Sequence, residues 1–307
     1  SGMESFSEFG AILLMQGFNG LSVFSVLLLM ALGLAIIFGQ MGVINMAHGE
    51  FMAVGAYTTF VFSAAAEAYL PAAMPYYFLV SMAGAFVVAF ALGWLVEWAM
   101  IRHLYRRPLD TLLATWGLSL VMQQALRSIF GPREVSPTLP DWMTGSLQPM
   151  EYVDIPINGL FVMTVTVLLT AGVLFAMFRS SWGLRVRATV QNRVMSGAVG
   201  IDTRRVDRAT FALGCGIAGI AGSAFTTISA TGPTSGSLYI VDTFLTVVFG
   251  GAASLFGTVA SAFVIAQTQS VSEFFMTGSM AKVLTLSAVV VILMLRPQGL
   301  FSIKVRK

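Results

Sequence analysis

Long apolar stretches, separated by short polar or glycine-rich segments, divide the chain into predicted helices. They cover residues 12–39, 49–69, 76–101, 111–130, 158–178, 209–229, 241–276 and 281–296. A membrane-spanning helix needs about 20 predominantly apolar residues, so most of these stretches have the length of one crossing. The stretch 241–276 is too long for one crossing and is interrupted near its middle by the glycine-rich segment 250–257. The pattern predicts an all-α, polytopic membrane protein with about eight transmembrane helices and additional broken or re-entrant segments.

Composition agrees with a membrane protein and narrows its type. Apolar residues make up 57% of the 307 residues and charged residues only 10%, whereas a soluble domain carries about 25% charged residues. A transmembrane β-barrel would show short segments of alternating polarity rather than long continuous apolar runs. Ser1-Gly2 ahead of Met3 is interpreted as a tag scar (residues 1–2), which leaves residues 3–307 as a single transmembrane domain.

Basic residues predict the orientation of the chain in the membrane. Of the 17 Lys and Arg residues, 14 fall within the segments 102–107, 179–208 and 296–307. Cytoplasmic loops carry an excess of Lys and Arg, so all three segments are placed in the cytoplasm. The loop 132–157 holds four acidic residues and one Arg and is placed on the outer side, which would be the periplasm if the membrane is a bacterial inner membrane. The N-terminus then lies on this outer side and the C-terminus in the cytoplasm, and 241–276 must enter from outside and return.

A predicted break separates the first two apolar stretches. The sequence from Gly42 to Glu50 includes Asn45 and His48 and lies between two apolar runs. Non-helical backbone at membrane depth is tolerated where protein buries it or water lines it, and such breaks frame the path in many transporters. Asn45, His48 and Glu50 are therefore candidate path residues. The alternative is that they cap and pack the start of the next helix.

Other polar residues within apolar stretches are candidates of the same kind. Thr115, Ser119 and Gln123 recur every four residues and so share one helix face. That face either hydrogen-bonds to neighbouring helices or lines a polar conduit. Asp242 could form the rim of an outer vestibule or cap a helix, and Glu97 is interpreted as an interfacial residue or an ion-pair partner.

The cytoplasmic segment 179–208 has an amphipathic pattern. Apolar residues recur every four positions at Val186, Val190, Val194 and Ala198. This periodicity predicts a helix near 184–199, ended by Gly200. Such a helix either lies on anionic lipid or docks into a groove on a partner protein.

Motifs for catalysis and nucleotide binding are absent from the sequence. There is no G-x-x-x-x-G-K-[ST], no G-x-S-x-G and no cluster of zinc ligands. These motifs mark phosphate-binding loops, nucleophilic serines and metal sites, respectively. We therefore expect no catalytic residues, no metal and no cofactor in this chain. Energy for transport must come from another polypeptide or from an ion gradient.

Several motifs resemble one permease family. The segment Gly42-Val43-Ile44-Asn45-Met46-Ala47-His48-Gly49-Glu50 resembles the signature of branched-chain amino acid ABC-transporter permeases of the LivH type. The pattern Gly-Leu-x-x-Arg-Ala-x-x-x-Asn at 183–192 is similar to the cytoplasmic coupling segment of that family. Within it, the sequences at 111–117, 239–244 and 296–301 look closer to the urea-transporter permeases (UrtB). The resemblance extends over essentially the whole chain after the scar.

The resemblance implies a type II ABC importer permease with defined partners. These are a second related permease forming a heterodimer, two cytoplasmic ATPase subunits that hold ATP and Mg, and a periplasmic substrate-binding protein, with no nucleic acid. It also implies that the amphipathic segment couples to the ATPase, through Arg185, Val186, Val190, Asn192, Val194 and Ala198. The segment 252–257 is less glycine-rich than the family pattern leads one to expect.

Urea or a short amide is the expected substrate, with a branched-chain amino acid as the alternative and a passive channel as a third hypothesis. Urea is small, neutral and rich in N–H donors, so a path of hydroxyls, amides and carbonyls would suit it. A zwitterionic amino acid would favour fixed charges, which are scarce in the apolar stretches.

Overall fold

The computed structural model describes residues 2–150, 153–251 and 254–299. Ser1 of the interpreted scar, Glu151 of the loop 132–157, Ala252-Ala253 of the glycine-rich break and the basic tail 300–307 lie outside the described residues.

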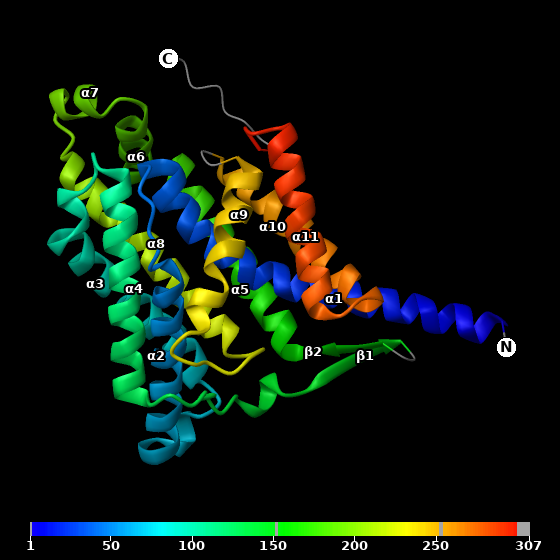
Figure 1. Cartoon of the computed structure of the whole chain (residues 1–307). Helices are drawn as coiled ribbons and strands as arrows, with labels where there is room; N and C mark the ends of the chain where they lie inside the picture. Colours follow the sequence, from blue (N-terminus) through cyan, green and yellow to red (C-terminus); the bar gives the residue numbers. More distant parts are fainter. Residues whose placement is uncertain (1, 151–152, 252–253, 300–307) are drawn as a thin grey trace.

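Long helices form most of the described structure (Figure 1). They are α1 (Gly2–Leu34), α2 (His48–Tyr69), α3 (Tyr77–Ala99), α4 (Pro108–Phe130), α5 (Ile157–Arg179), α8 (Thr203–Phe225), α9 (Ile240–Gly250), α10 (Leu255–Phe275) and α11 (Gly278–Leu295). Among the described residues, six helices are long and apolar enough to cross a membrane: α1, α2, α3, α5, α8 and α11. The helices α4 and α10, with 23 and 21 residues, are long enough but more polar. The predicted polytopic α-helical fold is confirmed.

Short elements connect these helices. They are the 3₁₀ turns η2 (Pro71–Ala73), η3 (Ile101–His103), η4 (Asp141–Met143) and η5 (Ser235–Leu238), and the antiparallel strands β1 (Ser146–Met150) and β2 (Val153–Pro156). The hairpin lies inside the loop 132–157 and does not change the α-helical class of the fold. Its strands of five and four residues are too short to give a sequence signal of their own.

The prediction of a single helix near 184–199 is wrong, because the structure has two helices in this segment. These are α6 (Ser181–Gln191) and α7 (Arg193–Ala198). Asn192 leaves the helical conformation, and its side-chain Oδ1 accepts the backbone N–H of Met195 at 3.0 Å. Asn is among the best helix N-caps because its side chain satisfies a free N–H of the first turn. Asn192 therefore ends α6 and starts α7, although the apolar periodicity predicted that one helix would continue through this position.

Glycine brings α2 and α8 into backbone contact at the centre of the molecule. A Cβ atom on Gly222 would clash with the Met52 carbonyl oxygen, and one on Gly55 would clash with the backbone of Gly219. Small residues at such crossings let helices approach closely in membranes. Because 16 of the 23 residues of α8 are buried, this helix forms the inner wall against which α1, α2 and α3 pack.

Replacing Gly222 by valine is expected to destabilise the fold, at the upper end of the roughly 1–3 kcal/mol typical of overpacking. The added side chain meets backbone rather than a mobile side chain, so neither helix can yield without moving. Thermal unfolding of the detergent-purified protein measures the loss. Gly172→Val is the matched control, because nothing lies within 4 Å of a Cβ atom at Gly172. Equal unfolding temperatures for both variants would contradict the close α2–α8 packing.

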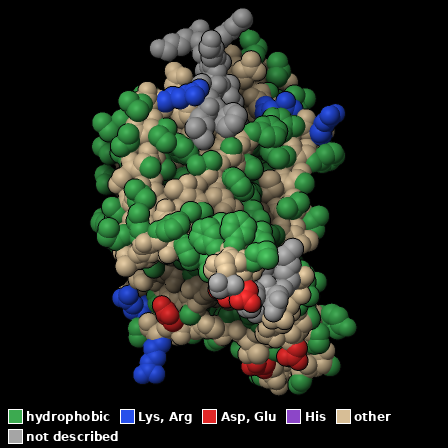
Figure 2. Space-filling model, turned by 90° about the vertical axis from the view of Figure 1, so that its right-hand side faces the viewer, with side chains coloured by type: hydrophobic (Ala, Val, Ile, Leu, Met, Phe, Trp, Pro, Cys, Tyr) green, Lys and Arg blue, Asp and Glu red, His purple; other side chains and the backbone are tan. Residues whose placement is uncertain are grey.

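Charged side chains gather toward the two ends of the molecule and leave an apolar band between them (Figure 2). The basic segments 102–107 and 193–208 line one cavity, and α6, α7 and the end of α11 lie at this same end (Figure 1). The β1–β2 hairpin lies toward the opposite end. The separation agrees with the sidedness expected from the charges; which end faces the cytoplasm stays a prediction.

Candidate functional site

The predicted break between the first two spans is present. After α1 the chain forms a π-helical turn, η1 (Ala35–Gln40), leaves the helix after Met41 and resumes it at His48. Gly42 has φ of +70°, a conformation that glycine adopts without steric cost. π-helical turns occur frequently at functional sites. Of the residues between η1 and α2, which we call the break, Val43, Asn45 and Ala47 are buried and Gly42 is exposed.

Asn45 lies at the centre of the break and is fully buried. Its Oδ1 accepts the backbone N–H of Ala47 at 3.0 Å, so half of the amide closes a local turn, close to the capping role considered from sequence. Its Nδ2 has no hydrogen-bond partner within the described residues. Because an unpaired buried donor costs free energy, this nitrogen is a candidate contact for a solute.

The polar face of α4 packs against the break. The Thr115 Oγ1 accepts the backbone N–H of Met46 at 3.1 Å, and Gln123 Nε2 donates to Glu50 Oε1 at 2.8 Å. Ser119 is buried on the same face, but its hydroxyl donates to the carbonyl of Trp116 in its own helix. The shared face predicted for Thr115, Ser119 and Gln123 is confirmed, and two of its three residues hydrogen-bond to the break or to α2.

Glu50 is the buried carboxylate of this site. Its exposed fraction is 2%, and no Lys or Arg of the described chain forms an ion pair with it. A carboxylate within a membrane protein is costly unless it is paired or functional. Glu50 and the unpaired Asn45 nitrogen together provide an acceptor and a donor at the same helix break.

His48 faces a different neighbour. Its Nε2–H donates to the Met30 carbonyl at 3.0 Å, and its ring lies against the position of Gly33 on α1. Residues two apart on a helix point about 200° apart, so His48 faces α1 while Glu50 faces α4. The structure thus places His48 in helix packing and separates it from the polar α4 face.

A second break lies between α9 and α10. The 11 residues of α9 span about 16 Å, roughly half of a membrane core. Gly251 has φ of +97°, and Ser254 caps α10 by accepting the N–H of Gly257 at 3.0 Å. Ahead of α9, the backbone of Gly236 in η5 packs directly on Gly49 of α2. The segment that leads into the second broken element therefore touches the first.

Asp242 does not join the group at the first break. It lies in the first turn of α9, and its Oδ2 pairs with the Lys282 Nζ of α11 at 3.4 Å. From the sequence, Asp242 was expected to form a vestibule rim or a helix cap. Its ion pair could not be predicted, because Lys282 lies 40 positions away in the sequence.

Comparison with known proteins decides the family. Residues 17–295 match the model of the family described as branched-chain amino acid transport system, permease component. The chain belongs to this family. The permease is 27% identical over 296 residues to LivH of Escherichia coli K12, described as a high-affinity branched-chain amino acid transport system permease protein. The alignment covers 94% of this chain and 95% of LivH.

More distant organisms hold similar proteins. The permease is 26% identical to BraD of Pseudomonas aeruginosa, with 94% and 95% of the two chains covered. It is 24% identical to a probable LivH of Methanocaldococcus jannaschii, with 92% and 90% covered. No solved structure matches the chain significantly. The expected family is thus confirmed, whereas none of these relatives carries a name that supports the urea subgroup.

Two ion pairs connect the elements at the basic end of the permease. Arg208 Nε of α8 donates to Glu97 Oε2 of α3 at 2.6 Å, and the Tyr105 hydroxyl donates to Glu97 Oε1 at 2.9 Å. Arg193, the first residue of α7, forms two hydrogen bonds with Asp207 of α8, at 2.5 and 3.0 Å. The ion-pair interpretation of Glu97 is confirmed. The network links α7 to both α8 and α3.

Burial and hydrogen bonding shift the pKa values of two members of this network, Tyr105 and Arg193. Burial, together with the neighbouring Glu97 carboxylate, raises the pKa of Tyr105 far above its usual range, so the hydroxyl keeps its proton. The hydrogen bonds to Asp207 raise the pKa of Arg193, so this guanidinium stays charged. The link between α7 and α8 is therefore a fixed, charge-assisted contact.

Removing the Arg208 side chain is expected to cost about 3–5 kcal/mol of stability, because it leaves a buried carboxylate without its cation. The Glu97 side chain is only 1% exposed. Thermal unfolding of purified Arg208→Ala measures the loss, and the exposed Arg205→Ala is the matched control. A double Glu97→Leu/Arg208→Met variant should regain most of the stability. An Arg208→Ala variant as stable as the wild type would contradict the pairing.

The coupling residues predicted in α6 and α7 do not form one stripe. Val186 is buried against the core of the permease, whereas Val190 and Val194 are 46% and 85% exposed. The remaining predicted residues, Arg185, Asn192 and Ala198, are exposed. Because the helix restarts at Asn192, α7 presents its apolar side chains outward instead of continuing the face of Val186.

Metal chemistry has no support within the described residues, where no three His, Cys, Asp or Glu side chains gather as a ligand set. Membership in a permease family accords with a transport role rather than a catalytic one.

Proposed function

We propose that this chain is a membrane-spanning subunit of an ATP-driven importer in a bacterial inner membrane, and that its solute is a branched-chain amino acid. The observation that carries the proposal is the full-length likeness to permeases named for branched-chain amino acids, which spans 94% of the chain. In this proposal the N-terminus is periplasmic and the C-terminus cytoplasmic. A second related permease completes the path, and a periplasmic binding protein delivers the solute.

Two features support the ATP-driven part of the proposal: the missing nucleotide-binding motif and an exposed apolar surface at α6 and α7. Its sequence contains no phosphate-binding G-x-x-x-x-G-K-[ST] motif, so nucleotide must be bound by another subunit. At the basic end, α6 and α7 project from the bundle (Figure 1) and expose Val190, Val194 and Val199. An exposed apolar surface of this kind suits a protein partner. We assign it to one of two cytoplasmic ATPase subunits, which would hold ATP and Mg.

The path part of the proposal rests on the break between η1 and α2. Irregular backbone is tolerated at membrane depth where it lines a cavity or is covered by protein. The unpaired Asn45 nitrogen and the buried Glu50 carboxylate lie at this break, beside the polar α4 face. A zwitterion offers an ammonium group to Glu50 and a carboxylate to an amide N–H. This complementarity supports an amino acid as the solute.

Urea remains a second candidate because of one observation. No hydrogen bond or ion pair in the described chain joins a Lys or Arg to Asn45 of the break, Glu50 of α2 or Gln123 of α4. A carboxylate of an amino acid would thus find only neutral donors there. Urea, which is neutral and has both N–H donors and a carbonyl acceptor, would be satisfied by the same amide and carboxylate groups.

The complex purified through this chain, with its ATPases and binding protein, distinguishes the candidates. Stimulation of ATP hydrolysis by a leucine-loaded binding protein is expected, with no response when urea replaces leucine. Stimulation by urea alone would transfer the proposal to the second candidate. Urea flux through liposomes that contain this chain alone, without ATP, would contradict both and indicate a passive channel.

A further inference from the structure

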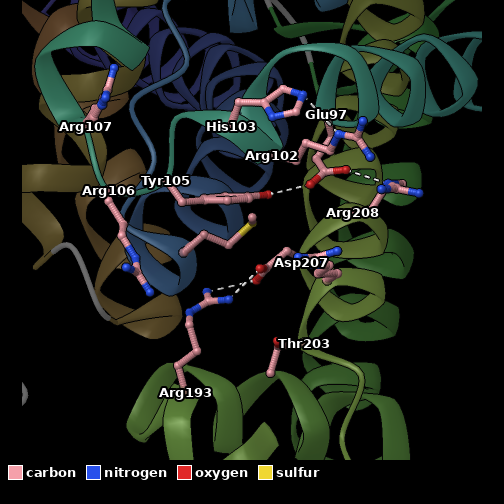
Figure 3. Close-up of a pocket in the computed structure, with 12 residues that line it drawn as sticks. Glu97, Arg102, His103, Tyr105, Arg106, Arg107, Arg193, Thr203, Asp207 and Arg208 are labelled. Carbon is pink, nitrogen blue, oxygen red and sulfur yellow. Dashed lines mark hydrogen bonds and ion pairs between the residues drawn. The ribbon is translucent and has the colours of Figure 1, made fainter.

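A cavity at the basic end of the permease is surrounded by arginines. Its volume is about 900 Å³, and it opens between η3, the start of α4, the start of α8 and α7 (Figure 3). Its arginines are Arg102, Arg106, Arg107, Arg193, Arg204 and Arg208. Only two carboxylates, Glu97 and Asp207, line the same space, which leaves an excess of four positive charges.

Both carboxylates of the cavity are already occupied. Glu97 accepts hydrogen bonds from Arg208 and Tyr105, and Asp207 accepts two from Arg193. Figure 3 shows these contacts as dashed lines. The other arginines are not neutralised by them. The cavity therefore keeps the positive charge of Arg102, Arg106, Arg107 and Arg204.

These remaining arginines have weak partners or none within the described residues. Arg107 pairs with Asp110 at 3.6 Å on the exposed surface, a contact of small energetic value. Arg102 donates to the neighbouring His103 and lies over the Trp98 ring. No ion pair is formed by Arg106 or Arg204 in the described chain. A guanidinium without a carboxylate is available to bind an anion.

Two tryptophans at the end of α3 lie against arginines that line the cavity. Trp94 and Trp98 lie in the last turns of α3 and contact the guanidinium groups of Arg208 and Arg102, with 5.5 and 5.3 Å to the ring centroids. Trp is enriched where the hydrocarbon core meets the headgroups. Trp98 is 48% exposed, so the cavity borders a surface that faces lipid.

The chemistry of the cavity matches phosphate. Guanidinium groups bind phosphate oxygens through paired hydrogen bonds, and basic pockets between transmembrane helices bind the headgroups of anionic lipids. The volume also lies within the range of small-molecule sites. We propose that this cavity binds a phosphate-bearing anion, supplied either by the headgroup of an anionic phospholipid or by a free phosphate compound, with Arg106 and Arg204 as ligands.

The test compares the wild-type chain with an Arg106→Gln/Arg204→Gln variant. Both are purified in neutral detergent from membranes supplemented with phosphatidylglycerol, and bound lipid is counted by native mass spectrometry. Retention of phosphatidylglycerol is expected to fall about tenfold in the variant. Arg127→Gln is the matched control: it removes an exposed arginine at the opposite end of α4 and should retain lipid like the wild type.

A second arm separates the two phosphate sources. In nanodiscs of neutral phosphatidylcholine, inorganic pyrophosphate is titrated against the unfolding temperature of the wild type and the variant. A rise in the wild type alone supports a free phosphate compound, and a rise only with phosphatidylglycerol in the nanodisc supports a lipid. Equal retention of phosphatidylglycerol by wild type and variant, with no response to pyrophosphate, would overturn the proposal. Reduced co-purification of a partner subunit with the variant, at unchanged lipid retention, would replace it with an acidic protein segment.

Discussion

Replacing Asn45 by leucine is expected to reduce solute uptake at least about tenfold, a change of about 1.4 kcal/mol or more. Leucine has the same branching and number of side-chain heavy atoms but removes both the acceptor that closes the turn with Ala47 and the unpaired Nδ2 donor. Uptake into proteoliposomes that contain the assembled complex measures the effect. The amount of assembled complex, measured by size-exclusion chromatography, should stay close to the wild type.

Asn45→Ser separates the two functions of this side chain. A serine hydroxyl can accept an N–H two residues ahead and so keep the turn, but it cannot reach the position of Nδ2. If the nitrogen contacts the solute, Asn45→Ser should also lose uptake while the complex assembles normally. Normal uptake by the serine variant would contradict a path role and would leave Asn45 as a residue that only shapes the turn.

Aspartate in place of Val194 is expected to separate ATP hydrolysis from transport. Val194 is 85% exposed on α7, so the change should not disturb the fold of the permease. In an apolar contact with the ATPase, however, the buried charge would be costly. Co-purification of the ATPase should fall about tenfold, and solute uptake with it.

The control for this experiment is the same substitution on an exposed apolar residue far from α7. Leu147 is 52% exposed in β1, toward the opposite end of the molecule, and Leu147→Asp should retain the ATPase. Val186 is unsuitable, because it is buried in the core and aspartate there would unfold the chain. Unchanged ATPase binding and uptake in Val194→Asp would contradict the assignment of α7 as the docking surface.

The helical framework of this chain could be predicted from sequence because the membrane enforces it. Backbone groups in lipid must be satisfied within a helix, so each long apolar stretch corresponds to a helix. The stretch 76–101 became α3 (Tyr77–Ala99), and 158–178 became α5 (Ile157–Arg179). Where polar residues extend a helix beyond its apolar part, capping residues rather than hydropathy mark its start. For example, α8 begins at Thr203, ahead of the apolar stretch 209–229, because Asp202 caps it.

The contacts of the candidate site could be predicted only in part. The shared face of Thr115 and Gln123 follows from their spacing, but only the structure shows that this face packs against the predicted break and the start of α2. An ion pair was one interpretation of Glu97 from the sequence, but its partner Arg208 could not be identified, because it lies 111 positions away. The division of the amphipathic segment could have been recognised from Asn192, a residue type that favours helix N-caps and here accepts the N–H of Met195. The apolar periodicity, which continues past Asn192, favoured a single helix instead.

Substrate choice is the least accessible property from sequence, for a physical reason. The expectation of urea used the scarcity of fixed charges in the apolar stretches, whereas the structure buries the Glu50 carboxylate beside the break with no ion-pair partner in the described chain. A single buried carboxylate changes which solute the site would satisfy. The relatives, named for branched-chain amino acids, support the amino acid over urea.

Uptake of labelled leucine by proteoliposomes tests the central proposal most directly. The liposomes contain the complete complex purified through this chain, with binding protein outside and ATP inside or absent. We predict leucine accumulation that requires ATP and is not reduced by excess urea. ATP-dependent accumulation of urea with no leucine uptake, or solute flux that does not need ATP, would contradict the account.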